Sequence, residues 1–378
     1  MMNRILRCFF AHVAWLSVLF LPILNVTAAQ AQTVEIVRVD GAGGSTAPAG
    51  QGKGWGSNAY LYLQDGLTRA DALLDLPEPP DSVQIWVRGS STGISYRPDQ
   101  GSGFTANDRG ASFGMRPNVA VYGGFPDTGN PGFGDRDPAT YITILTGEIG
   151  TGDDFSDNSY HVVSANDTVI DLDNCLLEGF TITRGNAEDE NGGLGGGGIY
   201  IVNGSDLRVD QCLITDNRSG DAGYGAGIHI NASNPVITRC TISLNRNNSG
   251  TILYGGGIVI ENEAGSSENP VRIIDCIIDS NTAAHGGGVA IKTSAVGRLV
   301  NCLIVNNSIN PNAAPNQEPF GGGVAIDRGS FGMIINCTFS GNEAGRGGAI
   351  AHYGTATDSV LANSILWNDN ATQTKRGR

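Results

Sequence analysis

The stretch DCIIDSNTAAHGGGVAI, residues 275–291, combines a cysteine, a histidine and three consecutive glycines. Taken alone, it allows two interpretations. In the first, Cys276 and His285 meet around a glycine loop and form a reactive site. In the second, the stretch is one coil of a repeated structure, and the function must be sought elsewhere. The rest of the chain separates these interpretations, because a reactive site occurs once whereas a coil recurs.

A six-residue pattern, Cys-x-[Ile/Phe]-x-x-Asn, recurs along the second half of the chain. A further copy at residues 363–368 places Asn363 in the cysteine position and keeps Asn368. An earlier copy at residues 180–186 has Phe180 in the cysteine position and one extra residue before Asn186. The regular copies are Cys212 to Asn217, Cys240 to Asn245, Cys276 to Asn281, Cys302 to Asn307 and Cys337 to Asn342.

A second, glycine-led pattern alternates with the first. Its copies end at Ile199, Ile228, Ile258, Val289, Val324 and Ile350, which lie 29, 30, 31, 35 and 26 residues apart. Two interleaved patterns with irregular spacing indicate a constant core with variable loops. Both patterns alternate with period two, as strands do; Val289 and Ile291 face one way, Ala290 and Lys292 the other. We therefore predict an all-β solenoid whose equivalent strands pair in parallel from coil to coil.

Stacked coils explain the recurring columns. Neighbouring coils lie about 4.8 Å apart, so equivalent side chains sit over one another. The cysteines are expected to form a buried ladder of free thiols, because a disulfide needs Cβ atoms about 3.8 Å apart, closer than in-register stacking provides. The asparagines are expected at the bend after each strand, where stacked amides hydrogen-bond along the axis.

At this point the motifs resemble a known family. The segment TFSGNEAGRGGAI (338–350) is similar to the paired motifs of chlamydial polymorphic outer-membrane proteins and related right-handed parallel β-helix proteins. The segments at 119–125, 136–149 and 157–163 resemble the opening coils of large bacterial surface proteins of this type. The resemblance covers about residues 56–370 and implies a right-handed parallel β-helix. For function it implies an adhesin, a secreted passenger or, more distantly, a pectate-lyase-like enzyme.

The two ends of the chain carry separate predictions. Residues 1–31 have two arginines, an apolar run and an Ala-x-Ala exit, which indicates a cleaved signal peptide; a retained membrane anchor is the alternative. Residues 32–55 are expected to be a flexible leader, 58–76 a helix capping the first coil, and 83–89 the first strand. Residues 371–378 are expected to be a disordered tail. Either the product is truncated there or another chain covers the last coil.

Composition excludes one class of partner. The net charge is −14, and the lysines are Lys53, Lys292 and Lys375. Nucleic-acid binding needs clustered cations, so we expect no nucleic-acid partner. The glycine run at 192–198 precedes a predicted strand, not a helix, and no Cys/His spacing fits a zinc site.

The alignment of the repeats also tests whether His285 and Cys276 form a catalytic pair. His285 falls in a column of mostly flat side chains, which favours stacking over a catalytic pair with Cys276. The column reads Gly195, Tyr224, Tyr254, His285, Phe320 and Arg346.

Asp153, Asp154 and Asp157 lie within one short loop. Several oxygen ligands close in sequence suit Ca²⁺, the one cofactor that the sequence suggests. An acidic, solvated turn is the alternative, and the sequence leaves both open.

Lys292 is the candidate base of a lyase. It lies in the column Val202, Asn231, Glu261, Lys292, Asp327 and Tyr353, so Glu261 and Asp327 are its neighbours. Polysaccharide lyases of this fold use a lysine or arginine base, but flanking acids keep a lysine protonated. An exposed ladder of salt bridges is therefore the favoured interpretation. Four other side chains are predicted to form a binding face, namely Tyr200, His229, Asn231 and Tyr353.

These observations predict a secreted or cell-surface bacterial protein acting as a non-catalytic, adhesin-type binding module. Its expected partner is an extracellular glycan or a surface protein. Membrane contact is expected only through the signal segment or a missing C-terminal anchor. The alternatives are a pectate-lyase-like enzyme acting on acidic polysaccharide and a pure spacer.

Overall fold

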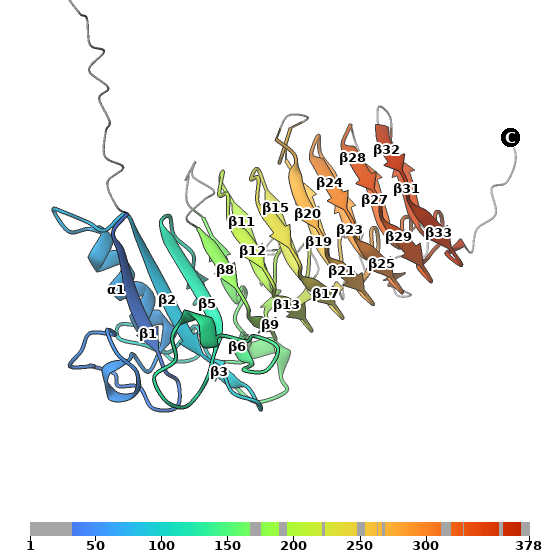
Figure 1. Cartoon of the computed structure of the whole chain (residues 1–378). Coiled ribbons are helices and arrows are strands. Elements are labelled where there is room, and N and C mark those ends of the chain that lie inside the picture. Colours follow the sequence, from blue (N-terminus) through green and yellow to red (C-terminus); the bar gives the residue numbers. More distant parts are fainter. Residues whose placement is uncertain are drawn as a thin grey trace, which may run out of the picture. The chain divides into compact units, whose positions relative to one another are not determined.

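The computed structural model describes residues 32–166, 175–188, 195–220, 224–247, 254–262, 264–266, 269–310, 319–327, 329–354 and 358–371. Within them the chain winds into coils whose strands stack in four parallel sheets, shown from blue to red in Figure 1. The predicted signal segment 1–31 lies outside the described residues. No helix in the described ranges has both the length and the apolar character needed to span a membrane.

The sheets are numbered in the order in which one coil visits them. Sheet I has ten strands among the described residues: β1 (Val34–Val39), β2 (Ser82–Arg88), β5 (Val119–Phe125), β8 (Leu176–Glu178), β12 (Arg208–Asp210), β16 (Val236–Thr238), β20 (Val271–Ile274), β24 (Val296–Val300), β28 (Phe331–Ile335) and β32 (Asp358–Ala362). Sheet II has nine: β3 (Ile94–Tyr96), β6 (Thr143–Thr146), β9 (Thr181–Thr183), β13 (Leu213–Thr215), β17 (Thr241–Ser243), β21 (Ile277–Asp279), β25 (Leu303–Val305), β29 (Thr338–Ser340) and β33 (Ile365–Trp367).

The other two sheets complete each coil. Sheet III has seven short strands in the described part: β10 (Asn186–Ala187), β14 (Arg218–Ser219), β18 (Arg246–Asn247), β22 (Thr282–Ala283), β26 (Ser308–Ile309), β30 (Glu343–Ala344) and β34 (Asn370–Ala371). Sheet IV has eight: β4 (Phe113–Gly114), β7 (Val163–Ala165), β11 (Ile199–Val202), β15 (Ile228–Asn231), β19 (Ile258–Glu261), β23 (Val289–Ile291), β27 (Val324–Asp327) and β31 (Ile350–Tyr353).

The register of the strands confirms both sequence patterns. In sheet IV the glycine-led strands pair residue for residue, from Ile199 with Ile228 through to Val324 with Ile350. The glycines are needed because consecutive coils approach closely before each strand; a Cβ on Gly288 would lie 2.6 Å from the carbonyl oxygen of Gly323. The fold is therefore the predicted right-handed parallel β-helix.

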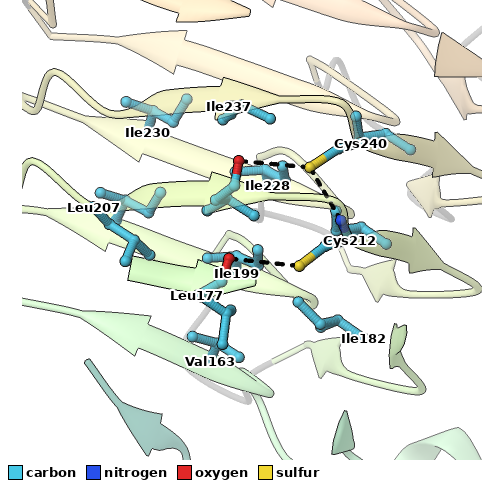
Figure 2. Close-up of a cluster of buried hydrophobic side chains, with 14 of the residues drawn as sticks. Val163, Leu177, Ile182, Ile199, Leu207, Cys212, Ile228, Ile230, Ile237 and Cys240 are labelled. Atoms are coloured by element: carbon cyan, nitrogen blue, oxygen red, sulfur yellow. Dashed lines mark hydrogen bonds between the residues drawn. The ribbon is translucent and has the colours of Figure 1, made fainter. Parts of the chain in front are cut away.

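The interior is filled by stacked aliphatic side chains and thiols (Figure 2). Figure 2 shows this stacking at Cys212 and Cys240 on successive coils. Ile214, Ile242 and Ile278 are fully buried in one column, with buried cysteines beside them. Each of the five thiols from Cys212 to Cys337 lies within hydrogen-bond reach of two carbonyls, as Cys212 Sγ does of Leu177 O at 3.7 Å and Asp210 O at 3.3 Å. All six cysteines from 175 to 337 are free, which confirms the thiol ladder.

The asparagine ladder is continuous, but two residues predicted to belong to it, Asn186 and Asn368, lie outside it. Asn342 Nδ2 donates to Asp369 Oδ1 at 2.7 Å, and the backbone N–H of Cys337 donates to Ser364 Oγ. The last coil is thus offset by one residue from the prediction. Asn363 and Asn368 instead occupy the left-handed positions on either side of β33, with φ of 50° and 56°.

At the other end of the ladder, Gly185 stands in the asparagine position. Its backbone N–H donates to Asn217 Oδ1 at 3.0 Å. Asn186, the predicted member, pairs with Arg218 in sheet III, so the early copy contains no extra residue. Phe180 does occupy the cysteine position, because Thr181 pairs with Leu213.

The N-terminal segment is ordered where a flexible leader was predicted. β1 pairs with β2 over six residues, and Val37 and Val39 are buried in the core. The strand was missed because the glycine-rich residues after it dominate the average composition of residues 32–55. β2, the predicted first strand, is consequently the second.

One α-helix, α1 (Leu63–Leu74), covers the interior at this end, as predicted. Leu63, Leu67, Ala70 and Leu73 recur at helical spacing and join the main core. The described residues also contain three 3-10 helices: η1 (Gly56–Asn58), η2 (Phe133–Asp135) and η3 (Phe155–Asp157).

Candidate functional site

The predicted lyase residues lie together on the outer side of sheet IV, but they are not exposed. Lys292 is 6% exposed, Glu261 4% and Asp327 0%. The prediction of an exposed salt-bridge ladder is therefore wrong. These three side chains face away from the core but are buried, because an aromatic column packs over this face of the sheet. The column consists of Tyr224, Tyr254, His285 and Phe320.

The buried side chains form one polar chain. Lys292 Nζ donates to Glu261 Oε2 at 2.7 Å, and His229 Nε2 lies 2.7 Å from Glu261 Oε1. The ammonium also lies 3.7 Å from the ring centroid of Tyr224 and 5.0 Å from that of Tyr254. Tyr254 in turn donates from its hydroxyl to Asp327 Oδ2 at 2.9 Å.

The electrostatics of this chain favour fixed charges. Burial by itself would raise the pKa of Glu261, but the His229 hydrogen bond and the Lys292 charge outweigh it, so the pKa of that carboxyl is lowered. Lys292 Nζ is engaged by this buried carboxylate and covered by the Tyr224 ring, as in a structural ion pair, whereas a general base needs a free lone pair directed at its substrate.

His285 and Cys276 lie in different layers. His285 stacks between Tyr254 and Phe320, with ring centroids 4.9 Å and 4.2 Å away, as the column predicted. The Phe320 N–H donates to His285 Nδ1, and burial lowers the pKa of the imidazole to about 4. Cys276 Sγ points into the interior and donates to Ile274 O at 3.2 Å.

The predicted binding face is not a single surface. His229 is buried, and Tyr200 stacks on His161 with ring centroids 4.5 Å apart. Asn231 Oδ1 accepts from Asn262 Nδ2 at 3.1 Å. Tyr353 alone of the four is strongly exposed, and its ring stacks on Phe320.

The predicted calcium ligands each serve a local structural purpose. Asp154 Oδ1 caps η3 by accepting from Ser156 N, Asp157 Oδ2 accepts from Thr151 N, and Asp153 Oδ1 pairs with an arginine. Within the described residues, no group of three or more His, Cys, Asp or Glu side chains is placed to hold a metal ion. The loop is held to the coils by Phe155, whose ring lies between the guanidinium groups of Arg184 and Arg218.

The surface that sequence reasoning missed is the outer face of sheet II. From β13 to β33 it consists of four columns in strict register, here named the sheet II face. One central column is largely aliphatic: Leu213, Thr241, Ile277, Leu303, Thr338 and Ile365. The second central column is mainly hydroxyl-bearing or acidic: Thr215, Ser243, Asp279, Val305, Ser340 and Trp367.

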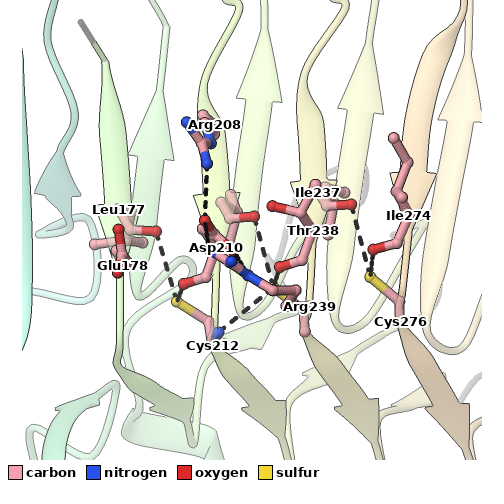
Figure 3. A network of polar contacts seen from close by, with 12 residues as sticks. Leu177, Glu178, Arg208, Asp210, Cys212, Ile237, Thr238, Arg239, Ile274 and Cys276 are labelled. Carbon is pink, nitrogen blue, oxygen red and sulfur yellow. Dashed lines mark hydrogen bonds and ion pairs between the residues drawn. The ribbon is translucent and has the colours of Figure 1, made fainter. Parts of the chain in front are cut away.

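Two polar columns border this face, at the left-handed residues that bend the chain before and after each strand. The column before the strands is exposed throughout: Gln211, Arg239, Asp275, Asn301, Asn336 and Asn363. The column after the strands reads Asp216, Leu244, Ser280, Asn306, Gly341 and Asn368. Figure 3 shows this border at Arg239, whose guanidinium pairs with Asp210.

The aliphatic side chains of the first central column are open to solvent, with Thr241 and Thr338 standing between them. Leu213 is 37% exposed, Ile277 41%, Leu303 38% and Ile365 60%. The six-residue pattern never changes length here, so no loop interrupts the sheet II face, whereas the loops that vary in length connect sheet III to sheet IV and sheet IV to sheet I. The available signal was the constant spacing from the cysteine to the asparagine position. It was interpreted only as a core pattern.

Comparison with known proteins agrees with this architecture. Residues 146–309 match a family model described as "Right handed beta helix region". No curated protein and no solved structure matches the chain. Together with the four in-register parallel sheets, the match defines a right-handed parallel β-helix protein.

Proposed function

We propose that this chain is an exported, non-catalytic binding module whose sheet II face docks an extended polymer outside a bacterial cell. The carrying observation is a column of exposed aliphatic side chains, with threonine on two of its six coils, that no loop interrupts. Soluble proteins rarely leave a contiguous apolar strip open to water, and such strips commonly mark interaction sites. A straight, loop-free strip suits an extended partner better than a compact one.

Export and surface location are part of the same proposal. They are supported by the signal-like segment 1–31 and by the motif resemblance of TFSGNEAGRGGAI (338–350) to chlamydial polymorphic outer-membrane proteins. An adhesin-type role, with a surface glycan or surface protein as partner, follows from that resemblance together with the open face.

A double variant tests the proposed surface. Replacing Ile277 with Glu and Leu303 with Lys puts opposite charges on neighbouring rungs, which removes the apolar surface without adding net charge. Both side chains are exposed, so the fold should tolerate the change. The matched control is Leu76→Glu, an exposed leucine outside this face.

The assay measures retention of the mature chain by isolated bacterial and host cell-surface polysaccharides and by intact cells. Retention of the wild type and the control, with at least tenfold weaker retention of the double variant, is the expected result. Equal retention of all three proteins would show that the sheet II face is not the binding surface.

The lyase alternative has its own assay. Incubation with a uronate polymer and Ca²⁺ should yield no ultraviolet-absorbing unsaturated product, because Lys292 is buried and its Nζ is paired with Glu261. Product formation that disappears in Lys292→Ala would establish the lysine as a base and replace the proposal. In that event the buried polar chain would have to open during the reaction.

A further inference from the structure

The proposed function leaves the chemistry of the polymer unspecified, and the sheet II face carries information about it. Resting on that function, we infer that the face binds a neutral, ribbon-like glycan that runs parallel to the solenoid axis, with successive sugars on successive coils. Four observations support this: the repeat along the axis, the amphipathic cross-section, the charge of the face and its mismatch with a second copy.

The repeat is set by the coils. Equivalent residues of β13, β17, β21, β25, β29 and β33 follow one another at the strand spacing, about 4.8 Å. This step is close to the length of one sugar in a fully extended glycan. A polymer with such a repeat can make the same contacts on each coil, whereas a peptide strand has a shorter repeat, about 3.3 Å per residue, and loses register with the coils.

The cross-section of the face matches the two sides of a sugar ring. Ile277 and Leu303 offer aliphatic carbon at the centre of the face, which suits the C–H face of a ring. Asn301 and Asn336 on one border and Asn306 on the other offer amide donors and acceptors at the height of equatorial hydroxyl groups. A sugar ring that lies flat on the column can therefore satisfy both kinds of contact at once.

The charge of the face disfavours an acidic polymer. Arg239 is the one cation in the four columns from β13 to β33, all of which lie in the described ranges, and it pairs with Asp210. Asp275 Oδ1 accepts from Asn301 Nδ2, and Asp279 Oδ1 accepts from Asn306 Nδ2, both at 3.1 Å. Uronates and sulfated sugars would meet these carboxylates and no column of counter-charges.

The same charges argue against a second copy of the chain as the occupant. Two sheet II faces laid together would bring Asp275 and Asp279 of both copies into one interface, and each chain carries a net charge of −14. Like charges buried across an interface are costly. A neutral ligand avoids this cost.

The test uses calorimetric titration of the mature chain with β-1,4-linked glucose oligomers of increasing length, and with uronate oligomers of the same lengths. The expected result is an affinity for the neutral oligomers that rises with length over the first few sugars, changes little with salt, and is absent for the uronates. Ile277→Thr, which places there the residue found at Thr241 and Thr338, should weaken binding of a six-sugar oligomer about fivefold. Leu76→Glu, which lies outside this face, should bind it within twofold of wild type.

Three outcomes would overturn the glycan assignment. Uronate binding would do so, and so would a neutral-oligomer affinity that Ile277→Thr leaves unchanged. Self-association that Ile277→Thr abolishes would assign the face to a second copy. If the glucose oligomers fail while the Ile277→Glu/Leu303→Lys variant still loses retention on cell surfaces, the binding surface stands and its ligand class is wrong. If that variant retains binding, the proposed function itself fails.

Discussion

Left-handed residues bend each coil on both sides of sheet II. The positions before the strands hold Asn, Asp, Gln or Arg, and those after them hold mostly Asp, Ser, Asn or Gly. Asparagine, aspartate and glycine tolerate positive φ because their side chains are short or absent. Leu244, with φ of 58°, is the one aliphatic residue at these positions from β13 to β33, and its side chain is exposed.

Leu244→Asn should stabilise the fold. A leucine in the left-handed region costs about 1 kcal/mol that asparagine largely avoids, and little buried apolar area is lost. We expect the free energy of unfolding in urea to rise by about 0.5–1 kcal/mol. Leu213→Asn is the control, because that exposed leucine sits in an extended strand, and it should not stabilise. A loss of stability in Leu244→Asn would mean that the leucine side chain contributes contacts that outweigh the backbone strain.

His285 makes the fold sensitive to acid. Burial lowers the pKa of its imidazole in the folded state to about 4, against about 6.5 when unfolded. The unfolded chain therefore binds more protons between these values, and stability falls as the pH drops from about 6.5 to 4. His161, whose pKa burial also lowers to about 4, acts in the same direction.

His285→Phe should remove part of this acid sensitivity. Phenylalanine can stack between Tyr254 and Phe320 but cannot take up a proton. Between pH 7 and pH 4.5 the variant should lose about 1–3 kcal/mol less of its unfolding free energy than wild type. The comparison is made within each protein across pH, because losing the hydrogen bond from Phe320 N lowers the variant's stability at every pH. Identical pH profiles would show that His285 is hydrated in solution.

At the scale of elements, the asparagine ladder connects the coils where sheet II turns into sheet III. Asn281 Nδ2 donates to Ile242 O and to Asn307 Oδ1, and its Oδ1 accepts from the backbone and side chain of Asn245. Every rung therefore satisfies groups in the coils on both sides. The ladder ends on Asp369, whose Oδ1 accepts from the backbone N–H and from Nδ2 of Asn342.

Asn281→Ala should be strongly destabilising. The carbonyl of Ile242 and the N–H of Asn245 lose the bonds that they make to the Asn281 side chain. The side-chain amides of Asn245 and Asn307 each lose one hydrogen bond in the same buried site. We expect a loss of about 2–4 kcal/mol in urea unfolding. Ser340→Ala, on the outer side of sheet II, is the control and should change stability by less than about 0.5 kcal/mol. If both variants lost similar amounts of unfolding free energy, the asparagine ladder would contribute no more to stability than an outer side chain of sheet II.

The cysteine ladder is a packing element. The five thiols from Cys212 to Cys337 are at most 3% exposed, and burial raises the pKa of the Cys240 thiol. In the folded protein these thiols should therefore be inert to a colorimetric disulfide reagent, and they should all react after denaturation. Rapid reaction without denaturation would show that the coils separate readily.

At the scale of the whole molecule, the strands of each coil pair only with those of its neighbours, so stability is close to a sum of local terms. Side chains reach one coil further at Tyr254–Asp327 and Asn310–Asn247. α1 covers the interior beside β1 and β2, and the polar chain around Lys292 lies several coils further on. A defect beneath the helix should therefore loosen the nearby coils first.

Leu67→Ala tests this behaviour. Leu67 lies on the inner face of α1, and its side chain is buried against the core. Truncating it should lower the free energy of unfolding of this region by about 2 kcal/mol. Hydrogen exchange should accelerate in β1, β2 and β5 and remain close to wild type in β20, β24 and β28. Uniform acceleration along the chain would instead indicate one fully cooperative unit.

The sequence by itself determined the repeat, the strand direction, the interior columns and the capping helix. Period-two alternation and a fixed six-residue unit specify which side chains enter the core, and stacking at constant spacing aligns Cys212 with Cys240 and Asn217 with Asn245. Short segments without a repeat could not be predicted in this way. The strand β1 has glycine-rich neighbours and no repeated partner in the sequence. In the last coil, Ser364 and Asp369 hold the cysteine and asparagine positions, one residue after the predicted Asn363 and Asn368.

The tertiary structure decided which outward-facing columns meet solvent. Lys292 and Ile277 both point away from the core, yet Lys292 is buried beneath the Tyr224 and Tyr254 rings while Ile277 is open. Alternation along a strand separates inside from outside but carries no information about what packs over the outside. That depends on loops of irregular length and on aromatic side chains from other coils, which come together only when the solenoid is wound.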